Sequence, residues 1–175
     1  MVDIENEPVI SFIIPVADKK NEFAIGVGRR IGIVHWDGIS ATTKLSRTVG
    51  EVEKSEKYKN NRFNDAKADP KGRFYGGTMR LEEMGDIFDA RLGSFYMYTK
   101  DTGFTNLISN IGVSNGLAWN ENKKKFYYID SIDHDVKVYD WDAETGNISK
   151  WDIIYLNLKY KNKSIIKFFF VWTKK

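Results

Sequence analysis

Two short polar segments contain the residue types that are best suited to binding chemistry. Arg62, Asn64 and Asp65 place a guanidinium, an amide and a carboxylate within four residues, and Asn115 lies 51 residues after Asn64 in the sequence Val-Ser-Asn-Gly-Leu. A guanidinium and an amide can bind the hydroxyl groups of a polar ring, and an amide oxygen can face a hard cation. The two segments therefore indicate a site for a small polar ligand, although Asn-Gly is also typical of a turn.

The spacing of aromatic residues indicates which elements position these side chains. Phe23, Phe74 and Phe126 recur about every fifty residues, and each begins or nearly begins a strand-like run. A turn, Asp-Pro-Lys-Gly at 69–72, precedes the second run. Fifty residues is close to the period of a propeller blade built from four strands. We therefore expect Asn64 and Asn115 in equivalent strands of successive blades, pointing at one central axis.

Other strands are expected from apolar runs that end in Gly, Asp or Thr turns. They cover residues 11–16, 32–36, 93–98 and 135–141. Residues 80–89 are mixed in charge and interrupted by Gly85, which predicts a loop connecting two blades. Little of the sequence is typical of helix, so the predicted class is all-β.

Five ordered segments carry a family resemblance. They are Asn-Arg-Phe-Asn-Asp (61–65), Ala-Asp-Pro-Lys-Gly (68–72), Gly-Thr-Met (77–79), Ser-Asn-Gly-Leu-Ala-Trp (114–119) and Phe-Tyr-Tyr-Ile-Asp-Ser (126–131). Together they resemble the regucalcin family, also called senescence marker protein-30, gluconolactonase or luciferin-regenerating enzyme, and residues 9–15 resemble its insect branch. The resemblance implies a partial six-bladed β-propeller, about the first half with incomplete blades, truncated at both ends.

The resemblance also implies a function and its residues. Asn115 matches the family position that ligates a divalent metal (Ca, Zn, Mn or Mg), and Arg62, Asn64 and Glu82 match positions that contact substrate. The implied activity is metal-dependent hydrolysis of sugar lactones. The family's remaining carboxylate ligands would lie before and after this chain, so we expect the chain to be incomplete and inactive. A non-enzymatic calcium-binding propeller and a luciferin-regenerating protein are the alternatives.

No catalytic residue can be assigned from the sequence, because a general base is not evident. Asp65 is a weak candidate, and a carboxylate that caps the following turn is an equally good interpretation. The family usually has Asn-Asp-Gly where this chain has Asn64-Asp65-Ala66, and alanine would strain the backbone if that position needs a positive φ.

The remaining polar residues are expected to have structural roles. His35 and His134 have no partner at metal or triad spacing, and they are predicted in a strand and a turn; Asp130 is expected to end a strand. No Gly-Xaa-Ser-Xaa-Gly segment is present, which disfavours serine hydrolase chemistry.

Composition sets the remaining expectations. Residues 1–150 hold 21 basic and 23 acidic residues, so the net charge of +3 comes from six lysines after residue 150, and nucleic-acid binding is not favoured. With no cysteine, no signal pattern and no bilayer-length apolar run, the expected location is cytoplasmic and no membrane partner is expected.

The C-terminal segment differs in composition from the rest of the chain. Of the 25 residues at 151–175, 17 are Lys, Asn, Ile, Phe or Tyr. We therefore divide the chain into a propeller region (1–150) and an atypical tail (151–175). The tail resembles translated non-coding sequence, an artefact of the gene model, although residues 152–158 and 165–172 could form strands.

Overall fold

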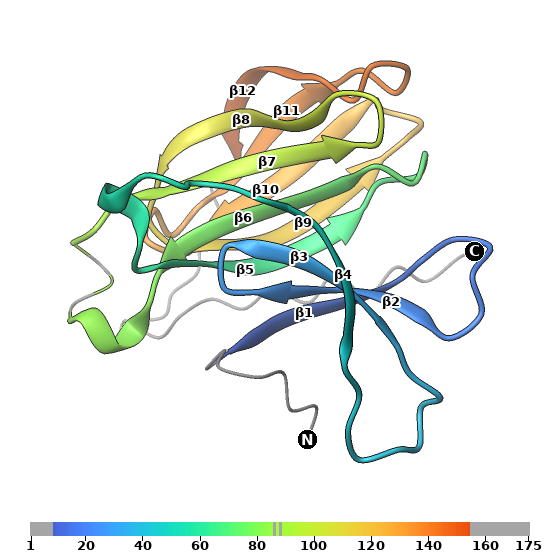
Figure 1. Ribbon diagram of the computed structural model, residues 1–175. Helices are drawn as coiled ribbons and strands as arrows, with labels where there is room; N and C mark the ends of the chain where they lie inside the picture. Colours follow the sequence, from blue (N-terminus) through green and yellow to red (C-terminus); the bar gives the residue numbers. More distant parts are fainter. Residues whose placement is uncertain (1–8, 86, 88, 155–175) are drawn as a thin grey trace.

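The computed structural model describes residues 9–85, 87 and 89–154, which form three four-stranded antiparallel sheets (Figure 1). The first sheet contains β1 (Ile10–Pro15), β2 (Glu22–Val27), β3 (Arg30–His35) and β4 (Leu45–Glu51). The second contains β5 (Asn61–Ala68), β6 (Phe74–Arg80), β7 (Gly93–Thr99) and β8 (Gly103–Ile111). The third contains β9 (Ser114–Asn120), β10 (Lys125–Asp130), β11 (Val136–Trp141) and β12 (Ile148–Ile154). Two short 3₁₀ helices, η1 (Glu56–Tyr58) and η2 (Glu82–Met84), lie outside the sheets.

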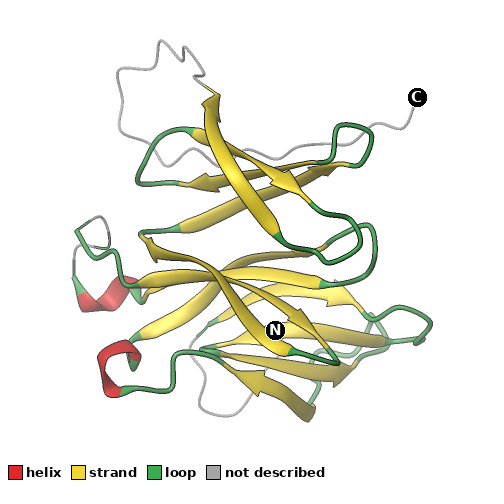
Figure 2. Cartoon of the chain, turned by 90° about the horizontal axis from the view of Figure 1, so that it is seen from above, coloured by secondary structure: helices red, strands yellow, loops and turns green. Residues whose placement is uncertain are grey.

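Each sheet is a simple meander in which consecutive strands pair, as in a propeller blade. Phe23, Phe74 and Phe126 all lie in the second strand of their sheets, so the predicted repeat and the all-β partial propeller are confirmed. The strands expected at 11–16, 32–36, 93–98 and 135–141 correspond to β1, β3, β7 and β11. Figure 2 shows the sheets packed face to face.

One expected connection differs in the structure. The segment at 80–89 connects β6 to β7 within the second sheet and contains η2, so the prediction that it connects two blades was wrong. Local charge and a glycine indicate a loop, but they do not show which strands that loop joins. β12 runs through position 150 and pairs with β11 as far as Ile154; the rest of the tail lies outside the described residues.

Aromatic side chains fill the space between the sheets. Phe12 and Phe63 meet edge to face, with centroids 6.0 Å apart, between the first and second sheets. Phe95 stacks on Phe126 at 5.5 Å and lies 4.7 Å from Tyr128 between the second and third sheets. The second sheet is therefore covered on both faces, which holds its first strand, β5, in place.

The third sheet is also linked to the second by polar groups. Asp130, the last residue of β10, is 1% exposed and accepts hydrogen bonds from the backbone N–H groups of Gly112 (2.8 Å) and Val113 (2.9 Å). These residues connect β8 to β9, so Asp130 fixes the passage from one blade to the next, as its expected structural role requires. No helix in the described part of the chain is long and apolar enough to cross a bilayer.

Candidate functional site

Arg62 lies near the start of β5 and is only 6% exposed. Its Nη1 donates to the backbone oxygen of Phe63 (2.9 Å) and to Oδ1 of Asn64 (2.9 Å). Its Nε donates to Oε2 of Glu82 (3.1 Å), and Nη2 forms an ion pair with the other oxygen of the same carboxylate. The guanidinium is therefore held in a fixed orientation, as a bidentate Arg–carboxylate pair requires.

A β-bulge places Asn64 toward the third sheet. The register of β5 against β6 shifts between Phe63 and Ala66, so two residues stand outside the regular pairing. Bulges of this kind re-aim side chains and are common beside functional sites. Nδ2 of Asn64 donates to the backbone oxygen of Ser114 (2.8 Å) and to Oδ1 of Asn115 (3.1 Å). The prediction that the two asparagines converge is therefore confirmed.

Asn115 is positioned by a second bulge, in β9. The pairing of β9 with β10 skips Gly116, whose φ is +27°. A Cβ at Gly116 would lie 2.7 Å from Cδ1 of Ile129, so this position accepts only glycine without a rearrangement. The Asn-Gly pair is thus a bulge within a strand and not the turn that its composition also allowed. Nδ2 of Asn115 donates to Oγ of Ser131 (2.7 Å).

The four residues predicted to bind ligand and metal form one hydrogen-bonded path. It runs from Glu82 through Arg62, Asn64 and Asn115 to Ser131. The hydrogen bond from Arg62 lowers the pKa of Glu82, so the ionised form of this half-exposed carboxylate is favoured further. The path therefore combines a neutralised ion pair at one end with neutral amides in the middle, a combination suited to hydroxyl groups and carbonyl oxygens.

The Asp65 carboxylate does not cap the turn that follows β5. Its Oδ1 accepts a hydrogen bond from the backbone N–H of Ala66 (2.9 Å) inside the strand, whereas Oδ1 of Asp69 accepts from the turn residues Lys71 and Arg73. Ala66 pairs with Gly76 inside β5 and is not among the residues with positive φ. The strain expected from alanine at position 66 is therefore absent, because the strand accommodates it opposite a glycine.

The oxygen ligands of the path do not by themselves fit a divalent cation. Oδ1 of Asn115 keeps a lone pair besides the one used by Asn64, but Glu82 is already paired with Arg62. Within residues 9–85, 87 and 89–154, no three His, Asp or Glu side chains gather closely enough to hold a metal ion. Calcium normally takes about six to eight oxygen ligands, drawn from carboxylates, carbonyls and water. His35 ends β3 with its side chain exposed and His134 lies in the turn after β10, as predicted.

Two further polar residues, one in the path and one outside it, were not expected from the sequence. Ser131 is 2% exposed and orients the amide of Asn115, although its place in the Tyr-Ile-Asp-Ser segment gives only a weak signal. Glu53 is a largely buried carboxylate that accepts from Asn61 (2.8 Å), Thr78 (2.7 Å) and Tyr96 (3.3 Å). Its partners come from β5, β6 and β7, so only the folded chain brings this group together.

Comparison with known proteins identifies relatives of the same kind. Chicken (Gallus gallus) regucalcin is 34% identical over 137 residues, which cover 78% of this chain and 44% of the relative. Human (Homo sapiens) regucalcin is 40% identical over 129 residues, covering 74% and 41%. The chain therefore spans less than half the length of these relatives.

Solved structures agree in fold. A luciferin-regenerating enzyme matches with a TM-score of 0.77 and 40% identity, covering 84% of this chain and 47% of that one. A calcium-binding protein, regucalcin, from Agrobacterium tumefaciens matches with a TM-score of 0.62 and 22% identity, covering 82% and 44%. Residues 2–164 match the model of the SMP-30/Gluconolactonase/LRE-like region. Because that match takes in most of the sequence, the chain belongs to the SMP-30/gluconolactonase/LRE-like family.

Proposed function

We propose that Glu82, Arg62, Asn64 and Asn115 form one wall of a sugar-lactone site. The observation that carries this proposal is the continuous hydrogen-bonded path through all four side chains. A guanidinium held by a carboxylate is pre-organised, so binding a ligand loses little further side-chain entropy. The amides of Asn64 and Asn115 can donate to and accept from ring hydroxyls without a change in protonation.

The reaction that we assign to the complete site is hydrolysis of the cyclic ester with a divalent cation. Asn115 is the proposed ligand, since its amide oxygen suits Ca²⁺, Mg²⁺ or Mn²⁺, and Zn²⁺ less well. A dication also needs carboxylates, and the described residues bring no suitable group of three together. We therefore expect the 175-residue chain to bind lactones and to hydrolyse them no faster than the buffer does.

Two measurements test this proposal. The first is hydrolysis of glucono-1,5-lactone above the spontaneous rate with Ca²⁺, Mg²⁺, Mn²⁺ or Zn²⁺, and no acceleration is expected. The second is NMR titration with 1,5-anhydroglucitol, a ring analogue without the ester, which should shift signals from β5 and β9. Asn64→Ala should weaken this binding at least tenfold, whereas Asn122→Ala, at an exposed position in the β9–β10 turn, should not. Absence of binding in the parent chain would refute the site.

Metal-dependent turnover that disappears in Asn115→Ala would support Asn115 as the metal ligand and contradict the expected lack of activity.

A second candidate, a calcium-binding protein without enzymatic activity, is favoured by the description of the Agrobacterium tumefaciens relative as calcium-binding. Calorimetric titration with Ca²⁺ separates the two: binding that is lost in Asn115→Ala, with no lactone binding, supports the second candidate.

A further inference from the structure

Glu53 lies in the segment that connects β4 of the first sheet to β5 of the second. Its Oε2 accepts a hydrogen bond from Nδ2 of Asn61 (2.8 Å), and its Oε1 accepts from Oγ1 of Thr78 (2.7 Å) and from the Tyr96 hydroxyl (3.3 Å). These donors belong to β5, β6 and β7. One carboxylate therefore joins the first three strands of the second sheet.

This arrangement of Glu53 has a cost for the stability of the fold. The three donors are neutral groups, and burial raises the pKa of Glu53, so its ionised form is less favourable in the fold than in water. Its backbone has a φ of +53°, in the left-handed region that long side chains seldom adopt. The backbone oxygen accepts from Nη1 of Arg29 (2.7 Å), which helps to hold this conformation. Residues in such conformations cluster at functional sites, so Glu53 is a candidate for a role beyond stability.

Glu53 is connected to the proposed lactone site through β5. Asn61 is 3% exposed and is followed directly by Arg62. Thr78 pairs with the residue between Arg62 and Asn64, immediately before the bulge that directs Asn64 toward the third sheet. Two of the three contacts of Glu53 therefore act on the part of β5 that positions both ligand-binding side chains.

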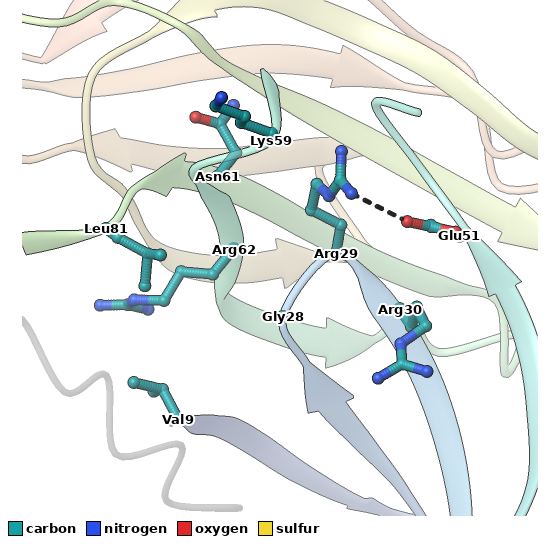
Figure 3. Close-up of a pocket in the computed structure, with 9 residues that line it drawn as sticks. All are labelled: Val9, Gly28, Arg29, Arg30, Glu51, Lys59, Asn61, Arg62 and Leu81. Carbon is teal, nitrogen blue, oxygen red and sulfur yellow. Dashed lines mark ion pairs between the residues drawn. The ribbon is translucent and has the colours of Figure 1, made fainter. Parts of the chain in front are cut away.

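The start of β5 has room to move on one side. Asn61 and Arg62 line a cavity of about 170 Å³, whose opposite side is formed by the β2–β3 hairpin. Figure 3 shows Arg62 on one side of Gly28 and Arg29 on the other. Side chains that line a cavity lack some of the contacts that packed neighbours would provide. Hydrogen bonds such as those to Glu53 therefore take a larger share in fixing this part of the strand.

We propose that Glu53 is a positioning residue for the proposed lactone site, and that its ionised carboxylate holds β5 in the geometry that binds ligand. The identity of the ligand rests on the proposed function. Hydrogen bonds to an ionised group are roughly twice as strong as those between neutral groups, and a protonated carboxyl carries a hydrogen on one of its two oxygens. Protonation of Glu53 therefore loosens the start of β5 and displaces Arg62.

The other titratable groups near Glu53 come from the β2–β3 hairpin, β4, η1 and β7. Arg29 contacts both the backbone oxygen of Glu53 and the carboxylate of Glu51 (3.3 Å). Burial and the charge of Glu53 raise the pKa of Tyr96 to about 12, and Tyr58 also contributes, so the Tyr96 hydroxyl remains a donor at neutral pH. Glu51 is the one further carboxylate in this group of residues, and it therefore requires its own control variant.

A pH titration of the ligand-free chain by NMR tests the positioning role. The Nε–H signal of Arg62 and the side-chain amide signals of Asn64 should shift in a step at the raised pKa of Glu53, above pH 4.5. The pKa of Glu82 is lowered from 4.5, so its own effect on Arg62 falls at lower pH. Glu53→Gln should remove the upper step, and the control Glu51→Gln should keep it. An upper step that is missing in the parent chain, or that persists in Glu53→Gln, would overturn the proposal.

Ligand affinity is the second measurement. The affinity of the parent chain for 1,5-anhydroglucitol should fall about threefold or more as Glu53 becomes protonated, and Glu53→Gln should show the lower affinity throughout that pH range. Tyr96→Phe removes the donor on β7, a strand without a predicted ligand contact, so it should lower stability and leave affinity unchanged. A parent affinity that does not depend on pH, or an equal loss in Tyr96→Phe, would overturn the proposal. If the parent chain does not bind 1,5-anhydroglucitol at all, the proposed lactone site fails, and the signals of Arg62 and Asn64 still decide whether Glu53 positions β5.

Discussion

Replacing Asp69 by alanine should destabilise the contact between the second and third sheets. The Asp69 side chain is fully buried in the turn between β5 and β6. Its Oδ1 accepts from the backbone N–H groups of Lys71 and Arg73, both at 2.9 Å, and Oδ2 accepts from Nε of Arg73 at 2.8 Å. Arg73 in turn donates to the backbone oxygens of Ala143 (2.7 Å) and Glu144 (2.9 Å) in the turn that joins β11 to β12 of the third sheet. Asp69 thus holds the arginine that joins the two blades.

The size of the effect follows from this burial. Removing one partner of a buried ion pair typically costs about 3–5 kcal/mol, because the other charge is left uncompensated. Arg73 is 12% exposed and keeps its two carbonyl acceptors, so we expect the lower end, about 3 kcal/mol. At about 2–4 °C per kcal/mol, the melting temperature should fall by roughly 6–12 °C.

Calorimetry or urea unfolding of the parent and variant chains measures this loss. A matched control is Glu144→Ala, which removes the exposed Lys71–Glu144 pair (3.9 Å) between the same two hairpins. Exposed pairs contribute about 0–1 kcal/mol, so the control should remain close to the parent. A loss below about 1 kcal/mol for Asp69→Ala, or losses of equal size in the two variants, would contradict the reasoning.

Three further substitutions test the packing of the second sheet and the buried carboxylate that its residues contact. A Cβ at Gly77 would lie 2.0 Å from Oγ of Ser114, so Gly77→Ala must displace β9; we expect a loss of about 1–3 kcal/mol in unfolding free energy and weaker binding of 1,5-anhydroglucitol. The control Gly72→Ala, at a φ of +83° with open space around it, should lose about 1 kcal/mol of unfolding free energy and leave binding intact. If Gly77→Ala also leaves binding intact, the position of β9 does not control binding of 1,5-anhydroglucitol. Burial raises the pKa of Glu53 above its ordinary value of 4.5, so the folded chain holds this proton more tightly than the unfolded chain, and stability should fall as pH rises from 4.5 through the raised pKa. Glu53→Gln should flatten that part of the profile in urea unfolding at several pH values, and parallel profiles for parent and variant would refute the assignment.

The fold could be predicted because its signals are local and repeated. Phe23, Phe74 and Phe126 each begin or nearly begin a run of strand-forming residues, and the period between them fixes the blade as the repeating unit. The strand pairing then follows from short turns between neighbours. The connection made by residues 80–89 was predicted wrongly, because the sequence of a segment can indicate a loop without indicating which two strands that loop joins.

The candidate site was predictable only in part. Residue type and spacing were sufficient to predict that Asn64 and Asn115 lie close together. The family resemblance added Glu82 to the predicted site. The two bulges were not predictable, because a bulge is defined by the register of one strand against another, and the sequence of β9 alone is equally compatible with a turn at Asn115-Gly116. The same holds for Glu53, whose three partners lie 8, 25 and 43 residues away.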